Sequence, residues 1–210
     1  MLGSDFSLTD IKEKLGLALF EKESLFAAVE EVEYSEHLRE TLKFNVSLAT
    51  AIHTEKARSE MIVVPVLLEI IRQTERELSL FSGVDFPVDK ALGLSGTCDF
   101  LMGLSPEQFF VEAPLIAIVE AKNDSIKSGL GQCAAEMRAA QVFNEAKGLI
   151  LPNLYGAVTT GTLWTFLRLT GDQVWIDADE YHISNAGKLI GIFLDIVATS
   201  RAALEAGKAP

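Results

Sequence analysis

The segment PLIAIVEAK at 114–122 constrains the fold more than any other part of the chain. Its first part is apolar at every position, so a strand formed here would be covered on both faces, as in the centre of a sheet that lies between helices. Side chains alternate between the two faces of a strand. Glu120 and Lys122 therefore point to the same side, at the end of a strand that is predicted to be buried.

The Glu120–Lys122 pair has two interpretations. A buried charge is costly unless it is paired or binds a metal. The pair is either a structural ion pair at a strand end, which contributes only about 0–1 kcal/mol to stability if it is exposed, or part of a functional site. The other acidic residues of the chain bear on that choice.

The spacing of apolar and turn-forming residues predicts the remaining elements. Helices are expected at 8–20 (capped by Ser7 or Thr9), 54–78, 125–147 and 185–207 (capped by Ser184 or Asn185), and strands at 78–89, 92–104, 114–122 and, as two or three strands, 154–177. Residues 36–52 fit either a helix or a strand. Pro65 is expected to kink its helix or to restart it, and the helix at 125–147 is expected to begin in earnest after Gly131. This order predicts an α/β fold with a mixed central sheet flanked by helices.

A second acidic residue is expected near the end of the 114–122 strand. Asp99 is predicted to end the preceding strand, and the chain between Asp99 and Glu120 is long enough for a turn and an adjacent returning strand. Two converging carboxylates hold a divalent cation such as Mg²⁺ through oxygen ligands. Beside them, Lys122 can orient or activate a water and offset negative charge that develops on a phosphate.

Four segments together resemble the motifs of the PD-(D/E)XK nuclease superfamily, whose members share the restriction-endonuclease-like fold. GTCDFLMG at 96–103 resembles the motif that supplies the aspartate, and IVEAKN at 118–123 resembles the (D/E)XK motif. GLGQCAAEMRAA resembles the following helix, whose glutamine would be Gln132. EKARSEMIVVPVLLEI is similar to the early helix, whose acidic residue would be Glu60.

The resemblance implies an αβββαβ core with the site at the open end of the sheet. Residues 1–50 would form a mostly helical N-terminal extension. Residues 51–205 would form the restriction-endonuclease-like core with the C-terminal helix, in one compact domain overall.

The resemblance also implies a reaction, the hydrolysis of phosphodiester bonds by a magnesium-activated water, with Mn²⁺ as a substitute, and it favours DNA over RNA. Asp99 and Glu120 would bind the metal, with Glu60 as a further ligand. Lys122 would position or deprotonate the attacking water, and Gln132 would orient the water or the site.

Two features depart from the family pattern. Cys98 replaces the proline of the motif before the aspartate, a proline that is often absent in the family, and the formal net charge is −12 at pH 7. Acidity opposes tight non-specific binding to nucleic acid, because phosphate contacts need Lys and Arg. The alternative is a catalytically inactive module of this fold that binds a partner protein or nucleic acid. Since cutting both strands commonly uses two sites, a homodimer or a protein partner belongs to either expectation.

Each candidate also has a structural interpretation. Asp99 could cap a turn, and Glu60 and Gln132 could face solvent. Glu136, one turn after Gln132, is a weaker site candidate, and Asp124 fits a helix N-terminus, where the dipole favours negative charge.

Two pairs of residues are candidates for contact with nucleic acid. Lys127 and Arg138 could contact phosphate, but a solvated helix face is the favoured interpretation. For Trp164 and Trp175, packing is favoured over base stacking, because no basic residues are interleaved with the aromatic ones.

Other classes of protein are not expected. No apolar run reaches the ~18 residues that a membrane helix needs, and the N-terminus lacks the basic start and apolar stretch of a signal peptide. We therefore expect a soluble cytoplasmic protein with no membrane partner. Cys98 and Cys133 form no CxxC pair, and the three histidines show no ligand spacing, so neither a disulfide framework nor a zinc site is expected.

Overall fold

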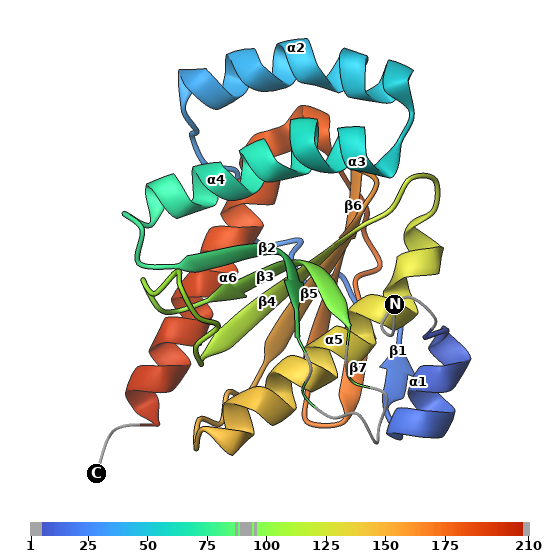
Figure 1. The fold of residues 1–210 in the computed structure, drawn as a ribbon, viewed down its shortest axis with the longest axis vertical. Coiled ribbons are helices and arrows are strands. Elements are labelled where there is room, and N and C mark those ends of the chain that lie inside the picture. Colours follow the sequence, from blue (N-terminus) through green and yellow to red (C-terminus); the bar gives the residue numbers. More distant parts are fainter. Residues whose placement is uncertain (1–5, 87, 89–93, 95, 208–210) are drawn as a thin grey trace.

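The computed structural model describes residues 6–86, 88, 94 and 96–207 (Figure 1). Its helices are α1 (Leu8–Leu15), α2 (Glu36–Ile52), α3 (Glu55–Arg58), α4 (Val64–Gln73), α5 (Ile126–Ala146) and α6 (Ala186–Ala206), with a π-helical turn η1 (Ser59–Val63) before α4 and a 3-10 turn η2 (Ile183–Asn185) before α6. Its strands are β1 (Ala18–Phe20), β2 (Ser79–Asp85), β3 (Thr97–Gly103), β4 (Leu115–Ala121), β5 (Leu154–Thr159), β6 (Leu163–Thr170), β7 (Gln173–Ile176) and β8 (Tyr181–His182).

The strands form one mixed sheet in the order β1-β7-β6-β5-β4-β3-β2, and β8 pairs with β6. The β1–β7 and β4–β5 pairs are parallel, and the other pairs are antiparallel. Every residue of β4 is buried. The predicted α/β class, with a mixed central sheet flanked by helices, is therefore confirmed, and β4 is a central strand as expected.

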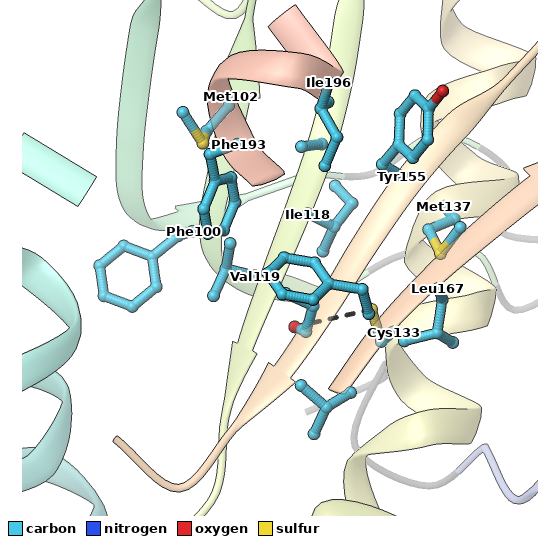
Figure 2. Packing of buried hydrophobic residues seen from close by; sticks show 14 of the residues in the cluster. Phe100, Met102, Ile118, Val119, Cys133, Met137, Tyr155, Leu167, Phe193 and Ile196 are labelled. Carbon is cyan, nitrogen blue, oxygen red and sulfur yellow. Dashed lines mark hydrogen bonds between the residues drawn. The ribbon is translucent and has the colours of Figure 1, made fainter. Parts of the chain in front are cut away.

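Helices cover both faces of the sheet. In Figure 1, α5 crosses one face of the sheet and α6 lies against the opposite face. Helix α4 contacts α6, and α2 packs against α4. In Figure 2, Phe193 of α6 packs beside Phe100 and Met102 on one side of β4, and Cys133 and Met137 of α5 lie on the other side. The central strands are thus held between two apolar layers.

The N-terminal segment differs from the expected helix at 8–20. Helix α1 is capped by Ser7, whose side chain accepts a hydrogen bond from Asp10 N, and it stops where Gly16 takes a left-handed conformation with φ of 67°. The chain then forms β1, which pairs with β7 at the edge of the sheet. This segment, expected to be a mostly helical extension, therefore also contributes a strand.

The expected helix at 54–78 is divided. Residues 36–52 are helical, and α3 then runs through the π-helical turn into α4. Pro65 lies in the first turn of α4, directly after the π-helical turn. The helical conformation is continuous from η1 into α4, so Pro65 marks a local change in the helical hydrogen bonding and not the start of a new helix.

Helix α5 begins earlier than expected, before Gly131. At Gly131 a Cβ atom would lie 2.1 Å from the carbonyl oxygen of Phe6, and at Gly129 it would lie 2.6 Å from Val158 Cγ1. These glycines let the helix approach the N-terminal segment and β5, and they do not interrupt it.

The remaining boundaries follow the predictions closely. Residues 154–177 form three strands, and α6 is capped by Asn185, whose side chain accepts a hydrogen bond from Lys188 N. Residues 87 and 89 of the strand expected at 78–89, and residues 92, 93 and 95 of the strand expected at 92–104, lie outside the described residues. Within the described part of the chain, no helix combines the length and apolar character needed to cross a bilayer.

Glu69 of α4 fixes the start of α2. Its carboxylate is 4% exposed and accepts hydrogen bonds from Ser35 N at 2.9 Å, Ser35 Oγ at 2.7 Å, Arg72 Nε at 2.9 Å and Gln73 Nε2 at 3.0 Å. Burial alone would raise the pKa of Glu69, but the hydrogen bonds from Arg72, Gln73 and Ser35 outweigh it and hold that pKa at about 2. The ionised form of Glu69 therefore stabilises the fold.

Replacing Glu69 with Gln is expected to lower the free energy of unfolding by about 2 kcal/mol at pH 7, because hydrogen bonds to a charged group are lost. The pKa of Glu69 lies below its ordinary value, so this stabilisation is present above pH 4.5 and fades as the pH falls toward 2. Urea denaturation should show that the difference in free energy of unfolding between wild type and variant is smaller at pH 3 than at pH 7. The matched variant Glu40→Gln, at an exposed position of α2, should change stability by less than about 0.5 kcal/mol, and an equal loss in both variants would contradict the account.

Candidate active site

The candidate site lies where β3 passes the end of β4. Asp99 does not end a strand as expected; it is the third residue of β3. Because β3 is antiparallel to β4 and Phe100 pairs with Val119, the start of β3 lies beside the end of β4. Asp99 Oδ2 accepts a hydrogen bond from Ala121 N at 2.8 Å. Asp99 and Glu120 are thus brought to the same corner of the sheet.

Glu120 and Lys122 are in direct contact. Glu120 is 1% exposed, and its Oε1 accepts a hydrogen bond from Lys122 Nζ. Their predicted placement on one side of the strand is confirmed. Lys122 N donates to Thr159 O at 2.8 Å, which holds the backbone of Lys122 against β5. Glu120 is thus buried and Lys122 half-buried, so the fully exposed pair of the structural interpretation does not describe this contact.

The first half of α5 supplies two further polar side chains. Lys122 Nζ also donates to Gln132 Oε1 at 3.1 Å, and Gln132 Nε2 donates to Glu136 Oε1 at 3.1 Å. Gln132 and Glu136 are both buried, so Gln132 does not face solvent. A continuous polar chain therefore runs from Glu120 through Lys122 and Gln132 to Glu136.

The carboxyl groups of the site repel one another. Burial, followed by the charges of Glu136 and Asp99, raises the pKa of Glu120 to about 9, against the opposing effect of Lys122. Burial and the charge of Asp99 raise the pKa of Glu136 to about 8, although the hydrogen bond from Gln132 opposes this. Oε2 of Glu120 and Oε2 of Glu136 are buried without hydrogen-bond partners. The cluster would therefore be stabilised by additional positive charge.

Lys122 is the ammonium group of this cluster. Burial acts to lower the pKa of Lys122, but Glu120, Glu55 and Asp99 outweigh burial and raise it. Lys122 is therefore positively charged at neutral pH. Its role at the site is that of a cation and hydrogen-bond donor.

The early helix presents a different acidic residue from the one expected. Glu60 lies in the π-helical turn, with a side chain that is 58% exposed and an ion pair to Lys56 Nζ at 2.8 Å. Glu55, at the start of α3, lies close enough for its charge to raise the pKa of Lys122. Glu60 as a metal ligand stays a prediction, and Glu55 is a candidate that the sequence did not reveal.

The donor set suits a hard divalent cation. Mg²⁺ is commonly bound through one or two carboxylates and keeps several waters, and Asp99 and Glu120 can supply those carboxylates. Glu120 Oε2, which lacks a partner, is free for such a contact. Across the described ranges, no group of three or more His, Cys, Asp or Glu side chains forms a ready metal cage, so water or substrate oxygens would complete the shell.

The other candidates have structural roles. Trp164 is fully buried and donates from Nε1 to Gly161 O at 3.0 Å, and Trp175 stacks on Phe20 with 4.3 Å between ring centroids. The preference for packing over base stacking is confirmed for both. Arg138 forms an ion pair with Asp172 at 3.1 Å.

Neither a comparison with family models nor a comparison with curated proteins found a match for this chain. The interpretation of the site therefore rests on its own geometry.

Replacing Glu136 with Gln is expected to stabilise the protein at pH 8 by about 1 kcal/mol, because the amide keeps the hydrogen bond to Gln132 and removes a buried charge. The pKa of Glu136 is raised to about 8, so wild type loses stability as the pH rises from 4.5 toward 8, and the variant does not. Urea denaturation at pH 5 and pH 8 tests this. Glu145→Gln, at an exposed position of the same helix, is the control. A Glu136→Gln protein that is less stable than wild type at both pH values would show that the ionised carboxylate stabilises the fold.

Proposed function

We propose that this chain is a metal-dependent nuclease of the PD-(D/E)XK superfamily that hydrolyses phosphodiester bonds, with DNA as the favoured substrate. The observation that carries the proposal is the buried contact of Glu120 with Lys122, with Asp99 on the neighbouring strand. Buried like charges that gather at one end of a sheet, with raised pKa values, are typical of functional sites.

The order of elements supports the restriction-endonuclease-like fold. An early helix (α3 through α4) is followed by β2, β3 and β4, then α5, and then β5. The β2–β3 and β3–β4 pairs are antiparallel, and α5 connects β4 to the parallel strand β5. This is the αβββαβ order that the family's core needs, and the cluster of charged residues lies at the end of β4.

The roles of the residues follow from their contacts. Asp99 and Glu120 would hold a divalent cation. Bound Mg²⁺, or Mn²⁺ in its place, would supply Lewis-acid activation of the attacking water and the scissile phosphate. Lys122 would donate a hydrogen bond to the water and offset negative charge on the phosphate, which its raised pKa favours over a role as base. Gln132 accepts a hydrogen bond from Lys122 Nζ and would fix the direction of the ammonium group.

A catalytically inactive binding module is the second candidate. Lys122 donates a hydrogen bond to Glu120, and the raised pKa of Glu120 favours the protonated carboxyl group at neutral pH. A site without metal could remain folded in this state. The net charge of −12 also favours contact with a protein partner or a second copy over unaided binding to DNA.

Cleavage of plasmid and of single-stranded DNA in Mg²⁺ or Mn²⁺ tests the proposal. Wild type is expected to cut only with metal, and Lys122→Ala and Asp99→Ala are expected to lower the rate by about a hundredfold or more. Lys122→Ala removes positive charge at the reacting phosphate, and Asp99→Ala removes a ligand of the metal. Circular dichroism confirms that the variants are folded, and an RNA substrate in parallel tests the preference for DNA. If wild type and both alanine variants are equally inert, the result favours the binding module. If all three proteins cut DNA equally, the activity comes from a contaminating nuclease.

A comparison of Glu55→Gln with Glu60→Gln identifies the acidic residue of the early helix that serves the site. Because the charge of Glu55 acts on Lys122 while Glu60 pairs with exposed Lys56, Glu55→Gln is expected to lower the cleavage rate more. The measurement is the metal concentration that gives half-maximal cleavage for each variant. A larger effect from Glu60→Gln would restore Glu60 as the predicted ligand.

A further inference from the structure

A cavity of about 640 Å³ lies next to the candidate active site. Its wall includes Asn123, which directly follows Lys122, and Thr160, which follows the residue whose carbonyl holds the backbone of Lys122. Other parts of the wall come from the end of α2, from α3 and from the first turn of α5, and the start of β6 and the β8 region complete it. A nucleic-acid strand bound at Glu120 and Lys122 would thus have a second place to contact the protein.

A buried guanidinium lines this cavity. Arg58 is 8% exposed, and it donates from Nη1 to Thr160 O at 2.9 Å and meets His53 Nδ1 from Nη2 at 3.2 Å. Its Nε is buried with no hydrogen-bond partner. In the described part of the chain, no carboxylate forms an ion pair with Arg58. A buried guanidinium on a cavity wall, with no carboxylate among the described residues to neutralise it, would be stabilised by an anion in the cavity.

The first turn of α5 contributes positive potential to the same cavity. No side chain caps this 21-residue helix at Ser125. Ser128 N donates to Ser125 O at 3.3 Å, and the N–H groups before it and the positive end of the helix dipole can interact with an anion. Ser125 and Lys127 both line the cavity. The exposed ammonium of Lys127 thus lies at the same wall as the buried guanidinium of Arg58.

Two carboxylates also line the cavity, Asp124 and Glu180. Asp124 Oδ1 lies 3.2 Å from His53 Nε2, and its side chain is 69% exposed. Because a guanidinium can only donate, His53 Nδ1 accepts from Arg58, and its Nε2–H donates to Asp124. An exposed contact of this kind is weak, so a more highly charged anion can displace Asp124 from His53. Asp124 therefore competes with a bound anion, and its removal should favour binding.

We propose that this cavity binds a phosphate group of the nucleic-acid strand, as a subsite beside the scissile phosphodiester. Arg58, His53, Lys127 and the first N–H groups of α5 would donate hydrogen bonds to its non-bridging oxygens. The inference rests on the proposed function in taking the phosphate from a nucleic acid. The phosphate itself belongs either to an internal phosphodiester or to a terminal phosphomonoester, and the chemistry of recognition is the same for both.

Binding of fluorescent single-stranded oligonucleotides without metal, measured by anisotropy, tests the subsite. The oligonucleotides carry either a 5′-phosphate or a 5′-hydroxyl, and inorganic phosphate serves as competitor. Lys127→Ala and His53→Asn are expected to weaken binding about tenfold, and Lys127→Ala should lower the slope of log affinity against log salt by about one. Asparagine tolerates the left-handed conformation that His53 adopts, with φ of 55°. Arg58 is left intact because its hydrogen bond to Thr160 supports the fold.

Matched controls come from the opposite end of α5. Lys147→Ala and Glu145→Gln, both at exposed positions there, should leave affinity unchanged, while Asp124→Asn should tighten binding. If Lys127→Ala weakens binding of the 5′-phosphorylated oligonucleotide only, the subsite binds a terminal phosphate. If Lys127→Ala weakens binding of both oligonucleotides equally, the subsite binds an internal phosphate.

Three results would overturn the subsite: equal affinity of Lys127→Ala and Lys147→Ala, weaker binding by Asp124→Asn, or no binding by wild type at low salt. Binding that depends on Lys127 in a protein that fails to cut DNA would support the subsite and refute catalysis, so the two proposals fail separately.

Discussion

The contact between Glu120 and Lys122 at the end of β4 is the interaction on which the rest of the site depends. A fully buried strand ends in a carboxylate that is 1% exposed, and desolvation of a carboxylate is costly unless a cation compensates. Lys122 supplies that cation from two residues away, on the same face of the strand. Gln132 from α5 and Asp99 from β3 then complete the surroundings, so three elements must be in place before the pair is stable.

The surroundings of the pair do not minimise the free energy of the folded chain. Glu136 is buried beside Gln132 with one carboxylate oxygen unpaired, and it raises the pKa of Glu120. A core built only for stability would place apolar side chains here. Glu69, by contrast, is a buried carboxylate whose hydrogen bonds lower its pKa to about 2. The two sites show the difference between a carboxylate that stabilises the fold and carboxylates held at a cost, as is common where function requires it.

Strand periodicity was sufficient to predict β4 and the shared face of Glu120 and Lys122, because a strand that is apolar on both faces must lie in the centre of a sheet covered on both sides. The same rules failed where tertiary contacts overrode local preference. Gly131 weakened the prediction for the start of α5, although the helix needs a glycine there to approach the N-terminal segment. The three-residue edge strand β1 carries too short a pattern to be recognised.

The acidic residue of the early helix could not be identified from sequence for a related reason. A π-helical turn lies between α3 and α4, and nothing in the spacing of apolar residues reveals it. Glu60 lies within that turn and forms an exposed pair with Lys56, while Glu55, which precedes the turn, acts on Lys122. Asp99, by contrast, reaches Glu120 because antiparallel pairing brings the start of β3 beside the end of β4.

The melting temperature of wild type and of Glu120→Gln in millimolar Mg²⁺ or Mn²⁺ tests the central claim most directly, because a cation that binds only the native state raises the melting temperature. The account predicts that metal raises the melting temperature of wild type and leaves that of Glu120→Gln unchanged. No response in wild type, or an equal rise in both proteins, would contradict a metal site at Glu120.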